Sequence, residues 1–297
     1  MNKHHLHPLL PVYALTLSCL AGSAHAAMTT ESWTWEFDDA SRNGTTSALG
    51  ETWNYSSDSF TNNSANLAVN AWSSTGDVSG PDTLETAQLG QWSGNGIGVL
   101  NRESDCHCLD GATTTSDAFE NMDAVLLSFD QDVTLSEIRV GWIQSGYDAD
   151  ISLLAWNGAG APSLFGETYP GLVGGSWDFL GHFYHSQDTT AVGGSDDQLY
   201  DFNSIADTGG VSTTSSSYYL LTVLNPELNV GNCDNPAEQL RYCSATAYSP
   251  NEKFKIWSIS AQSNIPSTPT SEVPEPSSLW LLLAGLPLLH RLRRQAT

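Results

Sequence analysis

Basic residues are scarce in this chain of 297 residues, which has 10 Lys and Arg against 33 Asp and Glu and a formal net charge of −23. Such a charge repels nucleic-acid phosphates and anionic membrane surfaces, so it excludes nucleic-acid binding and favours cations. Acidity does not indicate disorder in this case, because only 14% of the residues are charged and ten are tryptophan. Those aromatic side chains need a core or a ligand.

Helical periodicity is almost absent between residues 27 and 263. Short alternating or apolar runs are separated by Gly, Ser, Asn, Asp and Thr, which is the pattern of strands and turns. Without βαβ spacing, the pattern predicts an all-β domain of about ten to twelve strands, closed as a jelly-roll-like two-sheet sandwich. The expected strands are 32–37, 52–55, 67–72, 84–89, 97–100, 124–129, 133–143, 151–156, 177–184, 198–202, 218–224 and 254–261.

Three of these strands carry the strongest core signal: Ala124 to Phe129, Val133 to Ile143 and Ile151 to Trp156. Gln131 and Asp132 supply a turn after the first, and a short loop follows the second. Connections of this length join antiparallel neighbours, so we expect a β-meander.

Recognisable catalytic motifs are also missing. No nucleophile elbow surrounds a serine, and no His-Glu-x-x-His segment is present. The glycines between Gly90 and Gly96 are followed by no helical pattern, so they predict a tight turn or bulge rather than a nucleotide-binding loop. The run from Gly181 to Ser186 is better explained by strand packing than by a catalytic triad. We therefore expect no enzyme and no catalytic residues. A glycan hydrolase is the alternative, and it would need two carboxylates at a defined separation.

The N-terminus has the features of a signal peptide. Lys3 opens a weakly basic start, Leu9 to Leu20 is apolar, and Ala24 to Ala26 offers small residues to signal peptidase. Residues 1–26 are therefore predicted to be removed on export. Cys19 suggests a lipoprotein alternative, although the residues before it lack the usual leucine.

The C-terminus combines a short proline motif, an apolar run from Leu279 to Leu289 and an arginine cluster. The motif and cluster residues are Val273, Pro274, Glu275, Pro276, Arg291, Arg293 and Arg294. Prolines keep the motif extended, and the arginines stay on the cytoplasmic side of a membrane. The apolar run is shorter than the roughly 20 residues of a stable membrane span, which a tail that is later cut tolerates. An ordinary membrane anchor or a core helix are the alternatives.

This tail, residues 273–297, resembles the PEP-CTERM sorting signal of Gram-negative bacteria. The membrane protease-transpeptidase exosortase recognises and removes that signal. The resemblance implies transient inner-membrane anchoring by the C-terminal helix and then a place at the cell surface or outside the cell. Residues 264–272 form a linker rich in Ser, Thr and Pro, which predicts a flexible spacer. Without both signals, 6 basic and 31 acidic residues remain, so the mature net charge is −25.

A second resemblance covers roughly residues 90 to 157. The runs 96–102, 119–123, 125–129 and 148–154 are similar to those of exosortase-dependent surface proteins. The resemblance implies an exported structural protein of the surface or matrix and carries over no catalytic residue. Exosortase systems resemble those found beside exopolysaccharide production. The expected partners of the processed protein are therefore polysaccharide and other surface proteins. A carbohydrate-binding module is the alternative, which solvent-exposed coplanar tryptophans would favour.

Four cysteines remain after export: Cys106, Cys108, Cys233 and Cys243. An even number in an exported protein predicts two disulfides. A pair between Cys233 and Cys243 is favoured, which leaves Cys106 and Cys108 to pair locally or stay reduced. Cross-links between the two regions are the alternative. A metal site at residues 106–108 would need a further ligand, for which His182 or His185 could serve.

Acidic clusters predict a structural calcium ion as a possible cofactor. Glu120, Asn121 and Asp123 precede a strand, and Asp148 and Asp150 lie in a loop two strands on. A sandwich can bring such oxygens together at one end, and calcium takes six to eight of them. A second candidate cluster is Asp196, Asp197 and Asp201. The alternative is chance clustering on solvated loops of an acidic chain.

Overall fold

β-Strands dominate the computed structural model, in which 61% of the described residues belong to strands. The described residues are 28–59, 64–74, 83–101, 107–111, 122–147, 149–183, 198–202, 211–228 and 252–266. The chain divides into two units, and the one described below is Thr30–Ile265. Its strands form one connected antiparallel sheet, so the all-β prediction is confirmed.

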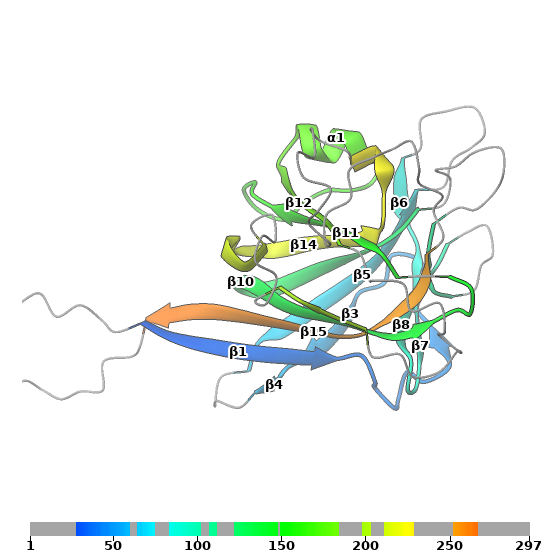
Figure 1. Ribbon diagram of the computed structural model, residues 1–297, viewed down its shortest axis with the longest axis horizontal. Helices are drawn as coiled ribbons and strands as arrows, with labels where there is room; N and C mark the ends of the chain where they lie inside the picture. Colours follow the sequence, from blue (N-terminus) through cyan, green and yellow to red (C-terminus); the bar gives the residue numbers. More distant parts are fainter. Residues whose placement is uncertain are drawn as a thin grey trace, which may run out of the picture. The chain divides into compact units, whose positions relative to one another are not determined.

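The elements follow one another as shown in Figure 1. They are β1 (Met28–Glu36), β2 (Thr45–Thr46), β3 (Trp53–Ser56), β4 (Asp58–Ser59), β5 (Asn66–Ser74), β6 (Leu84–Thr86), β7 (Gln88–Trp92), β8 (Gly96–Leu100), β9 (Leu109–Asp110), β10 (Met122–Ile143), β11 (Ile151–Trp156), α1 (Tyr169–Gly174), β12 (Trp177–Phe183), β13 (Gln198–Asp201), η1 (Val211–Thr213), β14 (Ser216–Val223), η2 (Pro226–Leu228) and β15 (Lys253–Pro266). The glycine run between β7 and β8 is the turn of a β-hairpin, as predicted.

The 22-residue strand β10 connects two portions of the sheet. Its residues 122–129 lie between β5 and β14, and its residues 134–143 pair with β15. We call the portion with β12, β11, β14, β5, β3 and β6 the first half-sheet. The portion with β13, β15, β1, β4, β8, β9, β7 and β2 is the second half-sheet. The register shifts between Ser128 and Val133, where the strand passes from one portion to the other.

Aromatic side chains of the two half-sheets meet in a sandwich-like core. The Trp35 ring of β1 lies 5.0 Å from Phe129 of β10, and Phe37 lies 4.8 Å from Tyr55 of β3. Alternation explains this packing, because every second residue of a strand points to the same side. Trp33 and Trp35 of β1 and Phe37, the residue after this strand, alternate along the chain and are all buried. Trp35 also donates its indole N–H to Ala65 O, so its polar atom is satisfied in the core.

The short helix α1 covers the other side of the first half-sheet. Thr168 begins it by accepting the N–H of Gly171, which satisfies one of the free donors at a helix start. Tyr169 is fully buried, and its hydroxyl donates to Met122 O at 3.0 Å. Both faces of β10 are therefore buried over residues 122–127.

Three predictions about strand order are corrected by this topology. Gln131 and Asp132 do not reverse the chain, since they lie within β10 at its irregular segment. The β-meander is wrong as well, because β14 lies between β10 and β11. The expected strand 84–89 is two strands, β6 and β7. In addition, β15 runs to Pro266, three residues into the predicted linker.

Candidate functional site

Two adjoining open hollows lie where β10, β11, β14 and β15 come together, beside η1. Their volumes are about 370 Å³ and 500 Å³, and both are lined by Asp132 and Ser215. We call the pair the polar hollow. Its remaining lining residues are Thr134, Trp156, Asn157, Gly158, Gly160, Ser212, Thr213, Ser216, Ser217, Tyr218, Gln262 and Ser263.

Trp156 is the largest side chain of the polar hollow, and its ring is partly exposed. Its indole N–H donates to Gly160 O at 2.8 Å, and its ring meets Trp177 edge-on at 5.3 Å. The ring lies so close to Gly158 that a Cβ at this position would collide with it. The loop after β11 therefore holds the indole in one orientation at the edge of the hollow.

Hydrogen bonds also fix the opposite wall. Ser216 Oγ accepts the N–H of Tyr218 at 3.1 Å and lies 2.8 Å from Trp156 O. The Tyr219 hydroxyl lies 2.7 Å from Val133 O and 2.9 Å from Thr214 O, which ties the start of β14 to the irregular part of β10. Burial raises the pKa of Tyr219 above its usual range, so this hydroxyl keeps its proton. The hollow is thus built before any ligand enters.

The chemistry offered by the polar hollow is hydrogen bonding beside an aromatic surface. Hydroxyl and amide groups predominate, and Asn157 Nδ2 donates to Asp178 Oδ1 at 2.7 Å. Among the described residues that line the hollow, Asp132 is the only carboxylate. Glycoside hydrolysis ordinarily uses two facing carboxyl groups.

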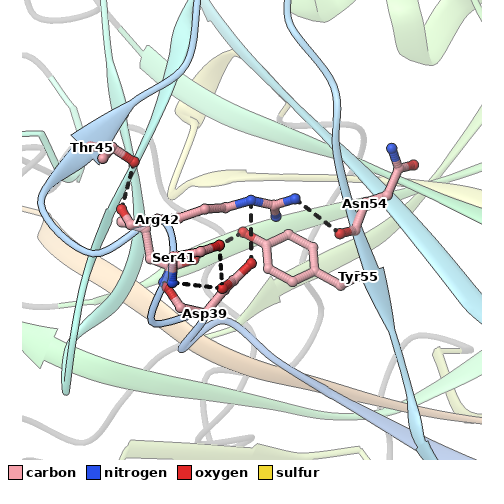
Figure 2. A network of polar contacts seen from close by, with 7 residues as sticks. Asp39, Ser41, Arg42, Thr45, Asn54 and Tyr55 are labelled. Carbon is pink, nitrogen blue, oxygen red and sulfur yellow. Dashed lines mark hydrogen bonds and ion pairs between the residues drawn. The ribbon is translucent and has the colours of Figure 1, made fainter.

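A polar cluster at the opposite part of the sheet serves packing (Figure 2). Arg42 lies over the rings of Trp53 and Tyr55, at 5.1 Å and 4.9 Å, and its Nε is 3.5 Å from Asp39 Oδ2. The Tyr55 hydroxyl donates to Gln91 Oε1, whose amide donates to Asp39 O. Burial raises the pKa of Tyr55 to about 12. Most polar groups of this cluster form hydrogen bonds or ion pairs with one another. The cluster therefore fills the space between β3 and β7.

Ser152 and His182 form a buried pair on the side of the first half-sheet that α1 covers. Ser152 Oγ accepts the N–H of Asn225 at 2.9 Å and lies 2.7 Å from His182 Nδ1. The Ser152 hydroxyl and His182 Nδ1 share this hydrogen bond, in which the tautomer of the ring sets the donor. Burial lowers the pKa of His182 to about 4, and the residue is only 7% exposed. The pair is a buried contact between β11 and β12, and the rest of the 181–186 run, Tyr184 to Ser186, lies outside the described residues.

The predicted calcium ligands are only partly described. Asp123 is fully buried and its Oδ2 accepts the N–H of Asp110 at 3.2 Å, while Asp150 is 5% exposed. Because β14 separates β10 from β11, these two positions are about 10 Å apart along the sheet. Glu120, Asn121 and Asp148 lie outside the described residues, as do Asp196 and Asp197 of the second cluster.

Metal binding finds no further support among the described side chains. Within the described ranges, no three His, Cys, Asp or Glu residues come together so as to hold a metal ion. His107 packs against Trp92 at 5.0 Å. Calcium binding therefore stays a prediction.

Cys108 is fully buried and disulfide-bonded, and the cysteine to which it bonds lies outside the described residues. Cys106, Cys233 and Cys243 are not described. The number of disulfides and their pairing therefore stay predictions.

Both sorting signals, including Val273 to Pro276 and the arginine cluster, fall outside the described residues. In the part of the chain that the structure describes, no helix is long and apolar enough to cross a membrane.

The polar hollow was not predicted from the sequence. Two local signals point toward it: Trp156 is followed by a turn with Gly158 and Gly160, and a run of six Ser and Thr residues spans 212–217. Neither signal shows that these segments meet Asp132 and Gln262.

No protein-family model matches the chain, and neither a curated protein nor a solved structure is significantly similar to it.

Proposed function

We propose that this protein is an exported structural component of the cell surface or extracellular matrix, and that it associates with exopolysaccharide through the polar hollow. The observation that supports this proposal is Trp156, a partly exposed indole held in place against Gly158 beside hydroxyl and amide groups. Sugars offer apolar ring faces and many hydroxyls, so they fit a concave site with one aromatic surface and several polar groups. A jelly-roll arrangement of the sandwich belongs to the proposal, since such a rigid frame suits a matrix protein.

The alternative function is that of a dedicated carbohydrate-binding module, which would use the same hollow to bind one sugar with high affinity. The residues around the hollow favour a glycan hydrolase least, because Asp132 has no second carboxylate beside it among the described lining residues.

Binding is tested by affinity electrophoresis of the mature protein in gels that contain dextran, xylan or hydroxyethylcellulose. Trp156→Ala removes the aromatic surface, and Trp72→Phe is the control because Trp72 is not among the residues of the hollow. Truncation of a central Trp anchor costs about 2 kcal/mol, so we expect roughly 30-fold weaker binding for Trp156→Ala. If neither wild type nor control is retarded by a neutral polymer, the polar hollow is not a glycan site.

The cellular part of the proposal concerns the tail, for which signal peptidase and exosortase are the processing enzymes. Cells with and without exosortase are fractionated, and the mass of the C-terminal peptide is measured. Processing predicts a C-terminus before Thr297 in normal cells and an inner-membrane form without exosortase. An intact Thr297 in the exported protein of normal cells would contradict the sorting proposal.

A further inference from the structure

Cations gather on the outward side of the second half-sheet, although the chain is strongly acidic. Of the six basic residues between positions 27 and 271, Arg139, Lys253 and Lys255 lie on β10 and β15. Their neighbours in sequence, Ile138, Val140, Phe254 and Ile256, are buried in the core. Alternation therefore places the three cations on the side away from the core.

Lys255 lies between two partly exposed tryptophans. Its Nζ is 4.4 Å from the centre of the Trp92 ring and 4.6 Å from that of Trp142, its register partner on β10. Trp257, also partly exposed, follows two residues later on β15. We call Lys255, Trp92, Trp142 and Trp257 the indole–lysine face. Ring faces attract a cation, so they hold the ammonium group in place.

The three cations differ in their acidic partners. Lys253 Nζ lies 3.7 Å from Asp110 Oδ2, and Arg139 lies 3.8 Å from Glu137. The ammonium group of Lys255 has no ion pair or hydrogen bond within the described part of the chain, and the residue is only 7% exposed. Burial lowers the pKa of Lys255, because water is largely withdrawn from the ammonium group. A bound anion would replace that lost hydration.

We infer that the indole–lysine face binds a carboxylate-bearing sugar residue of an acidic polysaccharide, with the carboxylate on Lys255 Nζ. Two complementary features favour this occupant over a simple anion. The ammonium group supplies the charge partner, and the partly exposed indoles supply flat apolar surfaces for a sugar ring. The inference rests on the proposed association with polysaccharide and names a chemical class for it.

The indole–lysine face is separate from the polar hollow. Lys255 and Gln262 are seven residues apart on the same strand, which corresponds to about 23 Å. One strand therefore carries an acidic-sugar site near its beginning and the polar hollow near its end. A protein with two such sites can join two polysaccharide chains.

The test compares polygalacturonate with its fully methyl-esterified form, which keeps the sugar and removes the charge. The mature protein, Lys255→Met and Lys253→Met are titrated by calorimetry. Methionine keeps an unbranched apolar stem between the rings, and Lys253 is a matched control because it lies two residues away with its own carboxylate partner. We expect wild type to bind the acidic polymer at least about tenfold more tightly than the ester. Lys255→Met should lose this preference, and Lys253→Met should change it by less than about threefold.

Several outcomes would overturn the inference. Equal losses in both variants would mean diffuse attraction to a cationic area, and equal binding of polyglutamate would mean an anion site without sugar recognition. One outcome supports it. If Trp156→Ala loses binding to the neutral polymer and still binds polygalacturonate, the indole–lysine face and the polar hollow are separate sites.

A second measurement covers the case that Lys255→Met does not fold. The mature chain contains only two lysines, Lys253 and Lys255. Polygalacturonate should protect Lys255 of the wild type from an amine-reactive reagent, as read by peptide mass, while the ester should not. Absence of selective protection would also refute the site.

Discussion

His182 should make the fold less stable in mild acid. Its ring is buried, with Nδ1 2.7 Å from Ser152 Oγ, and burial makes the folded state favour the neutral form. The folded pKa of about 4 lies below the unfolded value of about 6.5. Above the unfolded pKa both states are neutral, and His182 contributes no pH dependence. Between the two values only the unfolded state takes up the proton, so stability falls as the pH falls.

The size of this effect follows from the two pKa values. A difference of about 2.5 units corresponds to about 3 kcal/mol when both states are protonated. At about pH 4.5 the loss attributable to His182 should be about 2 kcal/mol relative to pH 7. That is a substantial share of the roughly 5–15 kcal/mol by which domains are stable.

The assay is urea unfolding followed by tryptophan fluorescence at both pH values. Many carboxylates titrate in the same window, so the useful quantity is the difference between wild type and His182→Asn. Asparagine offers an oxygen acceptor near the position of Nδ1 and does not titrate. We expect the variant to be less stable at pH 7 because it leaves a cavity, yet to lose about 2 kcal/mol less on acidification. Equal losses in the two proteins would show that His182 is not held neutral by the fold.

Three further predictions concern other parts of the chain. Replacing residues 274–276 by alanine should leave export intact and cause the uncleaved protein to accumulate in the inner membrane, as membrane fractionation would detect. If calcium binds through Asp123, a chelator should lower the melting temperature and calcium should restore it, with a weaker response in Asp123→Asn; sodium at matched ionic strength is the control, and an equal response to sodium would remove the specific site. Tyr219→Phe should destabilise the fold by about 1–3 kcal/mol in chemical unfolding, because buried carbonyl groups lose their donor; an unchanged midpoint would mean that water replaces the hydroxyl.

The all-β class could be predicted because alternation is a local property. The buried residues Leu67, Val69 and Ala71 of β5 alternate with less buried ones, as the sequence pattern indicates. The order of the strands is not local. β14 begins 60 residues after the end of β11, yet it pairs with β11 and β10 at once. Nothing in the periodicity of either strand specifies this partner.

The irregular segment of β10 was mistaken for a turn for a physical reason. Asp130 and Asp132 are exposed, as turn residues usually are, and they interrupt the apolar pattern. A β-bulge interrupts the apolar pattern in the same way, because its extra residue is left unpaired in the hydrogen-bond ladder between strands. The polar hollow depends on this irregularity, because it brings Asp132 next to Ser215. A site built from a bulge and two distant loops therefore could not be predicted from the spacing of residues.

The position of β15 has a mechanical consequence. This strand lies inside the sheet, with β10 on one edge and β1, β8 and β9 on the other. A force applied to its C-terminal end acts along the strand, while antiparallel hydrogen bonds run across it. The bonds between residues 254–262 and β10 would share such a load and would have to break together, rather than open one pair at a time. A pull along β15 from its C-terminal end would thus meet more resistance than a pull across the strand, which opens the pairs in turn.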